Sequence, residues 1–422
     1  MKNFQNFITD LSSLCKHPSV KASAQNDMPF GSGVQGALNE FNDIANKLGF
    51  KTKNYDNHIL ELSYGEGQEI GILGHLDVVP AGNGWNTDPF CLTEKDGVYF
   101  ARGVHDDKGP TLLCLYALKE VIDSGIKFNK KIRFFVGTDE ESGWEDIEYF
   151  NKHYGGFPEY GFSPDGHFPL TYAEKGIAPT IFTFPAFEKF TDLTGGVALN
   201  AVCDYATVKP LFIPEKGELD AFSLTFDGEL IHSKGISAHG SEPHKGKNAM
   251  KPIFEYMAFK GEKVQNVLDC LFLDKHGVFN MVSEQGSVTL SPNVVKSHSQ
   301  AVEILCDVRI PYPFTLEEVK QKFDLFGFSY QAEEHHKPTC LPKDGWFVNA
   351  LLNSYNKITG ENAKPISMGG STYARAFKMG CSFGADFPNT DNSIHNSNER
   401  FTKEEMLKTF DIYRLAIENL VK

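Results

Sequence analysis

Apolar residues near the N-terminus recur first at helical spacing and then in short runs. The first stripe, which predicts an amphipathic helix, consists of Phe4, Phe7, Ile8, Leu11 and Leu14. A second stripe predicts a helix over residues 34–48, and Gly49 follows it as a stop signal. Short strands are predicted at residues 51–55, 59–63 and 69–73.

Strand, acidic loop and helix then follow one another repeatedly. A strand expected at residues 98–100 precedes a helix at 112–121, and an apolar strand at 131–136 precedes another helix. This order predicts an α/β fold with a mostly parallel sheet flanked by helices. In such sheets, binding sites form outside the carboxyl ends of the strands. The polar residues expected at those ends are His75, Asp77, Asp106, Glu140, Glu141 and Asp165.

The pattern changes from about residue 177, where alternating polarity becomes common. The runs expected as strands are residues 181–184, 222–226, 287–290 and 301–308, and those expected as helices are 248–259 and 263–271. Together they predict an inserted α+β domain over residues 177–337, which ends in a polar linker containing Pro338.

Helical spacing returns after the linker, at residues 346–358 and again from Thr402 to the end. Thr402 and Glu405 have the spacing of a capping box at the start of the last helix. Residues 1–176 and 338–422 are therefore expected to form one domain around the insertion.

Composition and charge narrow the class of protein. A chain of 422 residues exceeds what one hydrophobic core usually serves. With 41 basic and 55 acidic residues, the net charge of −14 argues against nucleic acid or an anionic membrane as a partner. Eight scattered cysteines without a CxxC pair are typical of free thiols in a reducing compartment. No signal peptide or apolar run of about 18 residues is evident, so we expect a cytoplasmic protein.

The sequence Gly71-Ile72-Leu73-Gly74-His75-Leu76-Asp77 predicts a buried strand that ends in a histidine and an aspartate. Residues two apart on a strand point to the same face, so His75 and Asp77 leave it side by side. A histidine that binds a metal usually has its second ring nitrogen held by a carboxylate or carbonyl. Alone, this pair is more often part of a solvated loop.

Several further polar residues could join this pair in a metal centre. Glu140-Glu141 follows a predicted strand, Asp106-Asp107 precedes a predicted helix, and Asp165 and His395 lie in loops. Each feature alone is commonly a solvated loop, but the joint occurrence of two histidines and several carboxylates suits a pair of borderline metal ions. Such a two-metal site could bind an activated water and polarise a carbonyl, and a carboxylate beside that water that binds no metal would serve as general base.

In these residues the sequence resembles the aminoacylase/carboxypeptidase family of cocatalytic-metal peptidases, over essentially the whole chain. The shared motifs are His75-x-Asp77, Arg102-Gly103-x-x-Asp106-x-Lys108-Gly109, Glu140-Glu141, Asp165 and His395. The stretches 75–82 with Trp85, 106–110, 162–165 and 369–375 look like those of PepV-type dipeptidases. The resemblance implies a zinc-exopeptidase-like catalytic domain with an inserted α+β lid domain.

The resemblance also implies roles for the metal-centre residues. Asp106 would bridge two ions, because it lies three residues after Gly103, and Asp107 would be a helix N-terminal acid. His75 and Asp165 would complete one metal position, and Glu141 and His395 the other. Glu140 would be the general base and proton shuttle, and Asp77 would orient His75.

The expected lid supplies candidate residues for substrate binding. By resemblance, His239 would contact the substrate carbonyl, where it could steady the developing oxyanion. Asn200 and Gly370 would also contact substrate, and Arg309 would bind its carboxylate. Arg375 is a weaker candidate for that carboxylate and could instead form a structural ion pair. Two departures from the family pattern, Ala101 and Ser371 where glycine is typical, concern no metal ligand.

These features together predict a cytoplasmic, monomeric dipeptidase that holds two divalent ions, Zn²⁺ in first place with Mn²⁺ or Co²⁺ as alternatives. Its substrates would be dipeptides with free termini, with no nucleic acid and no membrane as partners. An N-acyl amino acid deacylase or desuccinylase on the same scaffold is the nearest alternative. A non-catalytic metal- or peptide-binding module is more distant, because it would have no use for an uncommitted Glu140. A phosphate-binding function lacks its motif, GxxxxGK[ST].

Overall fold

A computed structural model describes residues 1–422 and divides the chain into two compact units. Unit 1 comprises Met1–Tyr172, Leu341–Ile366 and Thr372–Lys422. Unit 2 comprises Ala173–Cys340 together with the short segment Ser367–Ser371. The predicted insertion, residues 177–337, lies within unit 2, whereas the sequence offered no signal that 367–371 would belong there.

Unit 1 is built on a mixed sheet whose centre is parallel. The four central strands are β6 (Lys131–Gly137), β3 (Glu69–His75), β7 (Tyr160–Ser163) and β22 (Met379–Ser382), in that order and all parallel. Antiparallel strands flank them: β1 (Thr52–Tyr55) and β2 (Ile59–Tyr64) beyond β6, and β8 (Thr171–Glu174) beyond β22. Two short strands, β20 (Thr339–Cys340) and β21 (Ile366–Met368), pair with β8 where the chain passes between unit 1 and unit 2. The mostly parallel sheet predicted from the sequence is thus confirmed at its centre.

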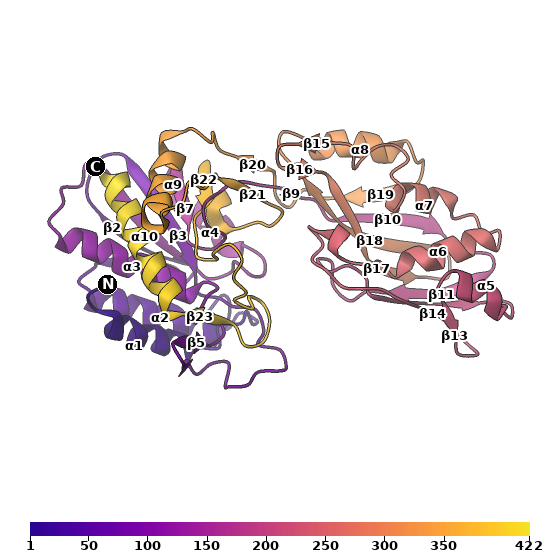
Figure 1. Ribbon diagram of the computed structural model, residues 1–422, viewed down its shortest axis with the longest axis horizontal. Coiled ribbons are helices and arrows are strands. Elements are labelled where there is room, and N and C mark those ends of the chain that lie inside the picture. The colour runs from indigo at the N-terminus through magenta and orange to yellow at the C-terminus, as the bar shows by residue number, and fades with distance from the viewer. The chain divides into compact units, whose positions relative to one another are not determined.

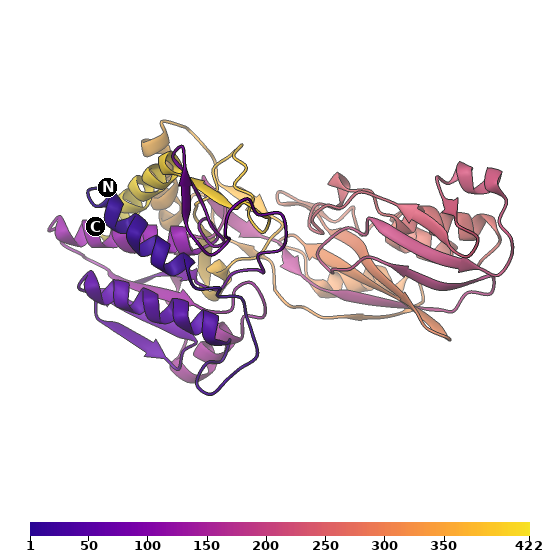
Figure 2. The ribbon, with the colours of Figure 1, turned by 90° about the horizontal axis from the view of Figure 1, so that it is seen from below.

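Helices flank this sheet (Figures 1 and 2). They are α1 (Phe4–Cys15), α2 (Ser32–Lys47), α3 (Lys108–Asp123), α4 (Glu145–Tyr154), α9 (Trp346–Thr359) and α10 (Lys403–Val421). Helix α3 packs against α1 and α10, and it is buried nearly all round because its run 112–118 is apolar on every face. The predicted capping box is present, with Thr402 and Glu405 bonded reciprocally at the start of α10.

A separate three-stranded sheet combines a hairpin before α3 with a strand before α10. It consists of β4 (Thr93–Lys95), β5 (Val98–Phe100) and β23 (Arg400–Thr402). Asp106 lies in the loop from β5 to α3, so it is not at a strand end of the main sheet. The sequence prediction was wrong on this point, because a short hairpin strand and a strand of the main sheet look alike in sequence.

Unit 2 contains an antiparallel sheet with helices on one face (Figures 1 and 2). Its strands are β9 (Gly176–Ile177), β10 (Thr180–Pro185), β11 (Phe190–Gly195), β12 (Tyr205–Pro210), β13 (Thr225–Phe226), β14 (Ile231–Lys234), β17 (Thr289–Ser297), β18 (Ala301–Ile310) and β19 (Ser329–Ala332). Its helices are α5 (Lys216–Ala221), α6 (Met250–Phe259), α7 (Gln265–Leu271) and α8 (Leu316–Asp324), with β15 (Val282–Ser283) and β16 (Gly286–Ser287) as a small hairpin.

The prediction of a strand over residues 222–226 was wrong for its first part. Phe222 follows the end of α5, and only Thr225–Phe226 forms a strand. The phenylalanines in this stretch made a helix end look like a strand, because Phe222 packs on the helix-lined core rather than on a pleated face.

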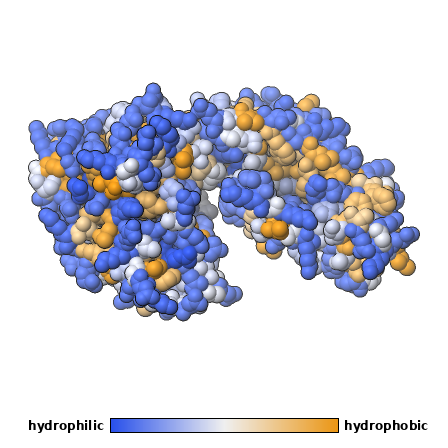
Figure 3. All heavy atoms as spheres, viewed as in Figure 1, coloured by the Kyte–Doolittle hydropathy of each residue, from blue (hydrophilic) through white to orange (hydrophobic).

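The viewed face of each unit is mostly hydrophilic, with apolar side chains in small groups (Figure 3). None of the helices combines the length and the apolar character that crossing a bilayer requires.

Candidate metal centre

The centre starts from the last residue of β3. His75 is fully buried, and its backbone N–H donates to the Asp107 carboxylate at 3.1 Å. Ring atom Nδ1 lies 3.0 Å from the Asp77 carbonyl oxygen and 3.3 Å from the Asp77 carboxylate. These acceptors favour the tautomer that carries its proton on Nδ1, which leaves the Nε2 lone pair to bind a metal.

Asp77 has a second function that its sequence position did not reveal. Its two carboxylate oxygens accept the backbone N–H groups of Glu140 at 3.0 Å and Glu141 at 2.9 Å. The same side chain therefore fixes both the imidazole of His75 and the corner after β6 that carries the acidic pair.

The other side of that corner is held by Asp146 and Tyr373. Asp146 accepts the N–H of Thr138 at 2.7 Å and the hydroxyl of Tyr373 at 2.5 Å, and that hydroxyl accepts the N–H of Asp139 at 3.1 Å. All these groups are buried. Nothing in the sequence pattern distinguished Asp146 from the other acidic residues of α4.

The two oxygens of Asp106 each face one histidine. Oδ1 lies 3.2 Å from Nε2 of His75, and Oδ2 lies 2.8 Å from Nε2 of His395. Glu141 Oε1 lies 3.1 Å from the same atom of His395, and Asp165 Oδ2 lies 3.8 Å from Nε2 of His75. A carboxylate between two imidazoles has the arrangement of a ligand that bridges two ions.

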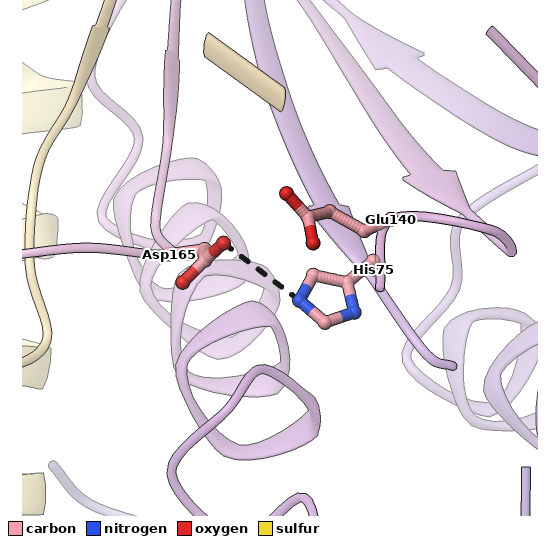
Figure 4. A group of neighbouring side chains, drawn as sticks. All are labelled: His75, Glu140 and Asp165. Carbon is pink, nitrogen blue, oxygen red and sulfur yellow. Dashed lines mark ion pairs between the residues drawn. The ribbon is translucent and has the colours of Figure 1, made fainter. Parts of the chain in front are cut away.

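Two sets of donor atoms, each within 4.8 Å of one another, share His75: one with Glu140 and Asp165, the other with Asp106 and Glu141. Figure 4 shows the first set, in which the carboxylates of Glu140 and Asp165 both turn toward the imidazole. The acidic pair is thus divided, since Glu140 lies with Asp165 and Glu141 lies with Asp106.

Burial and neighbouring charges shift the pKa values of the acids in the centre. Burial raises the pKa of Glu140 and of Asp165 well above their usual values, and neighbouring carboxylates raise both further. Burial and the Asp106 charge raise the pKa of Glu141 to about 7. Burial would also raise the pKa of Asp106, but hydrogen bonds with His395 and His75 hold it well below its usual range.

The pKa values of the two histidines in the centre are raised by the same neighbouring carboxylates. Burial would lower both pKa values, but the carboxylates prevail: Asp106 and Asp77 raise the pKa of His75 well above its usual value, and Asp106 and Glu141 raise the pKa of His395 to about 11. A buried cluster of this kind needs positive charge near its carboxylates. Two divalent ions fit it in both charge and donor type, because imidazole nitrogen and carboxylate oxygen are usual zinc and manganese ligands.

The predicted substrate-binding residues of the insertion come together in unit 2. The Asn200 carbonyl accepts the N–H of Gly240 at 2.7 Å, next to His239. The His239 Nδ1 atom accepts the N–H of Ser241 at 3.2 Å, which places the proton of a neutral ring on Nε2. That nitrogen is thereby a hydrogen-bond donor, as contact with a carbonyl oxygen requires.

Arg309 is a member of the same group and is paired within the unit. Its Nε and Nη2 donate to the Asp307 carboxylate at 2.7 and 2.9 Å, and Nη1 donates to the Gly369 carbonyl at 3.1 Å. Gly370 follows that carbonyl directly. The sequence did not indicate that Asp307, two residues earlier on β18, would hold the guanidinium.

Arg375 is not part of unit 2. It is in unit 1, on the 3₁₀ turn η2 (Tyr373–Ala376). The other 3₁₀ turn, η1 (Pro243–Lys245), is in unit 2. Its assignment to a substrate carboxylate stays a prediction.

Comparison with known proteins bears on the whole chain. The model of a family described as peptidase family M20/M25/M40 matches residues 71–419. The "Putative dipeptidase YtjP" of Bacillus subtilis is 33% identical over 431 residues, covering 93% of this chain and 92% of the relative. The "Putative dipeptidase SH1171" of Staphylococcus haemolyticus is 30% identical over 459 residues, covering 98% and 96%.

Solved structures with this fold include human carnosine dipeptidase 1, with a TM-score of 0.62 and 15% identity over 99% of this chain and 96% of that one. A tripeptidase from Staphylococcus aureus has a TM-score of 0.62 and 14% identity, covering 99% of both chains. The YXEP protein of Bacillus subtilis, described as a dinuclear metal binding peptidase, has a TM-score of 0.54 and 11% identity, with 99% of both chains covered.

Proposed function

Because the chain belongs to peptidase family M20/M25/M40, and is thus a metallopeptidase, we propose that it is a two-metal dipeptidase that hydrolyses dipeptides with free termini. The observation that supports two ions most strongly is the position of Asp106, whose oxygens lie 3.2 and 2.8 Å from Nε2 of His75 and of His395. Five donors with one shared carboxylate are too many for one tetrahedral zinc.

In the proposed centre, His75, Asp106 and Asp165 hold one ion, and Asp106, Glu141 and His395 hold the other. The ions would supply Lewis acidity that lowers the pKa of an attacking water and polarises the peptide carbonyl. Which of Zn²⁺, Mn²⁺ or Co²⁺ serves is part of the proposal, with Zn²⁺ expected first because it suits the mixture of imidazole and carboxylate.

Glu140 is the proposed general base. It lies beside His75 and Asp165, and Asp77 fixes its backbone N–H, so the corner after β6 holds the residue next to the proposed ions. Burial in this place favours the protonated acid, which is what a group must become when it takes the proton of an attacking water. It would then pass that proton to the leaving amine.

On the substrate side, we propose that His239 donates from Nε2 to the carbonyl oxygen as negative charge develops there. Asn200, Arg309 and Gly370 would hold the remainder of the dipeptide, Arg309 through its carboxylate. Support comes from the tautomer of His239 and from the grouping of these residues in unit 2. A monomeric enzyme in the cytoplasm completes the proposal.

A hydrolysis panel tests this function. Dipeptides, tripeptides and N-acyl amino acids are compared with Zn²⁺, Mn²⁺ and Co²⁺ in turn. The proposal expects dipeptides to have the largest kcat/KM. Faster cleavage of N-acyl amino acids would establish the deacylase or desuccinylase alternative, and tripeptides cleaved as fast as dipeptides would contradict the role of Arg309 as a carboxylate clamp.

A further inference from the structure

The loop that carries His395 has an unusual backbone. Four of its non-glycine residues have positive φ: Asn389 at 63°, Ser393 at 52°, His395 at 62° and Asn398 at 62°. Residues with a side chain rarely adopt this conformation, and it persists where surrounding contacts impose it. The contacts that hold this loop therefore decide where the imidazole of His395 lies.

Glu399, at the end of this loop, is fully buried and accepts four hydrogen bonds. One oxygen accepts the Arg102 guanidinium at 2.6 Å and the N–H of Gly103 at 3.1 Å. The other accepts the N–H of His105 at 2.9 Å and the N–H of Asp106 at 3.1 Å. A single side chain thus joins the loop of His395 to the backbone of Asp106.

Arg102 extends this connection. Besides its bond to Glu399, its Nη2 donates to the carbonyl oxygens of Pro80 at 3.3 Å and Asn396 at 3.2 Å, and the guanidinium lies over the Trp85 ring. Arg102 is 1% exposed, so its charge depends on the Glu399 carboxylate for compensation.

Asn392 makes a second connection at the start of the loop. Its amide nitrogen lies 2.8 Å from Nε2 of His105 and 3.1 Å from an Asp386 oxygen. Asn392 is also buried, at 5% exposure. Both ends of the His395 loop are therefore bonded to the segment that carries Asp106, while Glu141 reaches the same place from the corner after β6.

We propose that Glu399 is a positioning residue that sets the distance between Asp106 and His395, and so governs the metal position formed by Asp106, Glu141 and His395. This inference rests on the proposed two-metal function. The position of His75 and Asp165 depends less on Glu399, because His75 is the last residue of β3 and Asp165 lies just after the end of β7, outside the His395 loop.

The main competing explanation is that Glu399 only neutralises Arg102 and stabilises the fold. Glu399→Gln separates the two roles. Glutamine has nearly the same size, but its NH₂ group faces N–H donors that need an acceptor, so the amide contacts to the Asp106 segment cannot all be kept. A matched control is Glu61→Gln, because Glu61 is also buried and accepts Arg133 at 2.7 and 2.9 Å, yet contacts no candidate ligand.

The experiment titrates metal-free wild-type and variant proteins with Zn²⁺ by calorimetry and measures each Tm. Glu399→Gln is expected to weaken one of the two Zn²⁺ sites by about 10–100-fold, the usual effect of removing a group that orients a ligand. The other site should weaken less, and excess Zn²⁺ should restore much of the lost turnover. Glu61→Gln is expected to lower Tm without changing either affinity.

Asn392→Ala provides an independent variant in case Glu399→Gln does not fold, because it removes no charge. It should weaken the same single site, by a smaller factor. Unchanged Zn²⁺ affinities in the folded variants, or equal weakening of both sites, would overturn the proposal. A wild-type protein that binds fewer than two Zn²⁺ ions would instead overturn the two-metal function itself.

Discussion

The candidate metal centre of unit 1 and the predicted substrate-binding residues of unit 2 differ in how their charged groups are compensated. In unit 1, carboxylates from three places in the chain converge on His75, and burial raises the pKa of Glu140, Glu141 and Asp165. In unit 2, two of the corresponding side chains have partners within the unit: Arg309 has Asp307, and His239 has Ser241.

This difference gives the two regions different roles, one in binding cations and the other in donating hydrogen bonds. The centre in unit 1 is organised to receive cations, because burial and mutual repulsion disfavour the charged forms of Glu140, Glu141 and Asp165. The group in unit 2 is organised to present donors in fixed directions. Changes in unit 1 should therefore alter metal content together with rate, whereas changes in unit 2 should alter rate or substrate preference at constant metal content.

The largest effect is expected from Asp106→Ala. This change removes the carboxylate between His75 and His395, so at least one ion and nearly all turnover should be lost. Metal analysis after dialysis, beside a dipeptide assay, gives both quantities. A variant that keeps two ions and substantial activity would show that Asp106 is not shared.

A smaller but still large effect is expected from His239→Ala in unit 2. Loss of one oxyanion donor typically lowers kcat by about 10²–10³, and KM should change little because the interaction strengthens only as charge develops. Both ions should stay bound, which is the contrast with Asp106→Ala. If KM alone rises, His239 binds substrate in its ground state, and if metal is lost, the division between the two regions fails.

The smallest expected effect is the release of protons when metal ions bind. At pH 7, the metal-free centre holds protons on His395, whose pKa is raised to about 11, and in part on Glu141, whose pKa is raised to about 7. Ligands must be deprotonated to bind a metal, so binding should release protons and the apparent affinity should rise with pH. Calorimetry in buffers with different ionisation enthalpies measures this release, and proton uptake would contradict this charge balance.

The elements of the fold that depend on local sequence patterns could be predicted from the sequence. The apolar run before His75, the helix over residues 112–121 and the last helix with its Thr402 cap follow from spacing and cap chemistry, and the structure contains all three, the second within α3 (Lys108–Asp123). The predictions that were wrong concerned short elements: Asp106 follows a strand of the small sheet, and Phe222 lies at the end of a helix.

The contacts that orient the functional groups were not predictable, because they join residues far apart in sequence. Glu399 bonds to the backbone of residues 103, 105 and 106, and Asp77 bonds to that of Glu140 and Glu141. A carboxylate that accepts backbone N–H groups leaves no pattern in composition or periodicity. The structure was needed to distinguish Glu399 and Asp146 from ordinary surface acids.

The central claim is that Glu140 moves protons while Glu141 holds a metal, although the two are adjacent. The most direct measurement is the metal content and turnover of Glu140→Gln beside Glu141→Gln. Glutamine keeps the shape of Glu140 but cannot accept the proton of the attacking water, so this variant should keep both ions and lose at least about 10²–10⁴ in rate. Glu141→Gln should instead lose occupancy at one position. Wild-type turnover in Glu140→Gln, or loss of metal from it while Glu141→Gln keeps both ions, would contradict the claim.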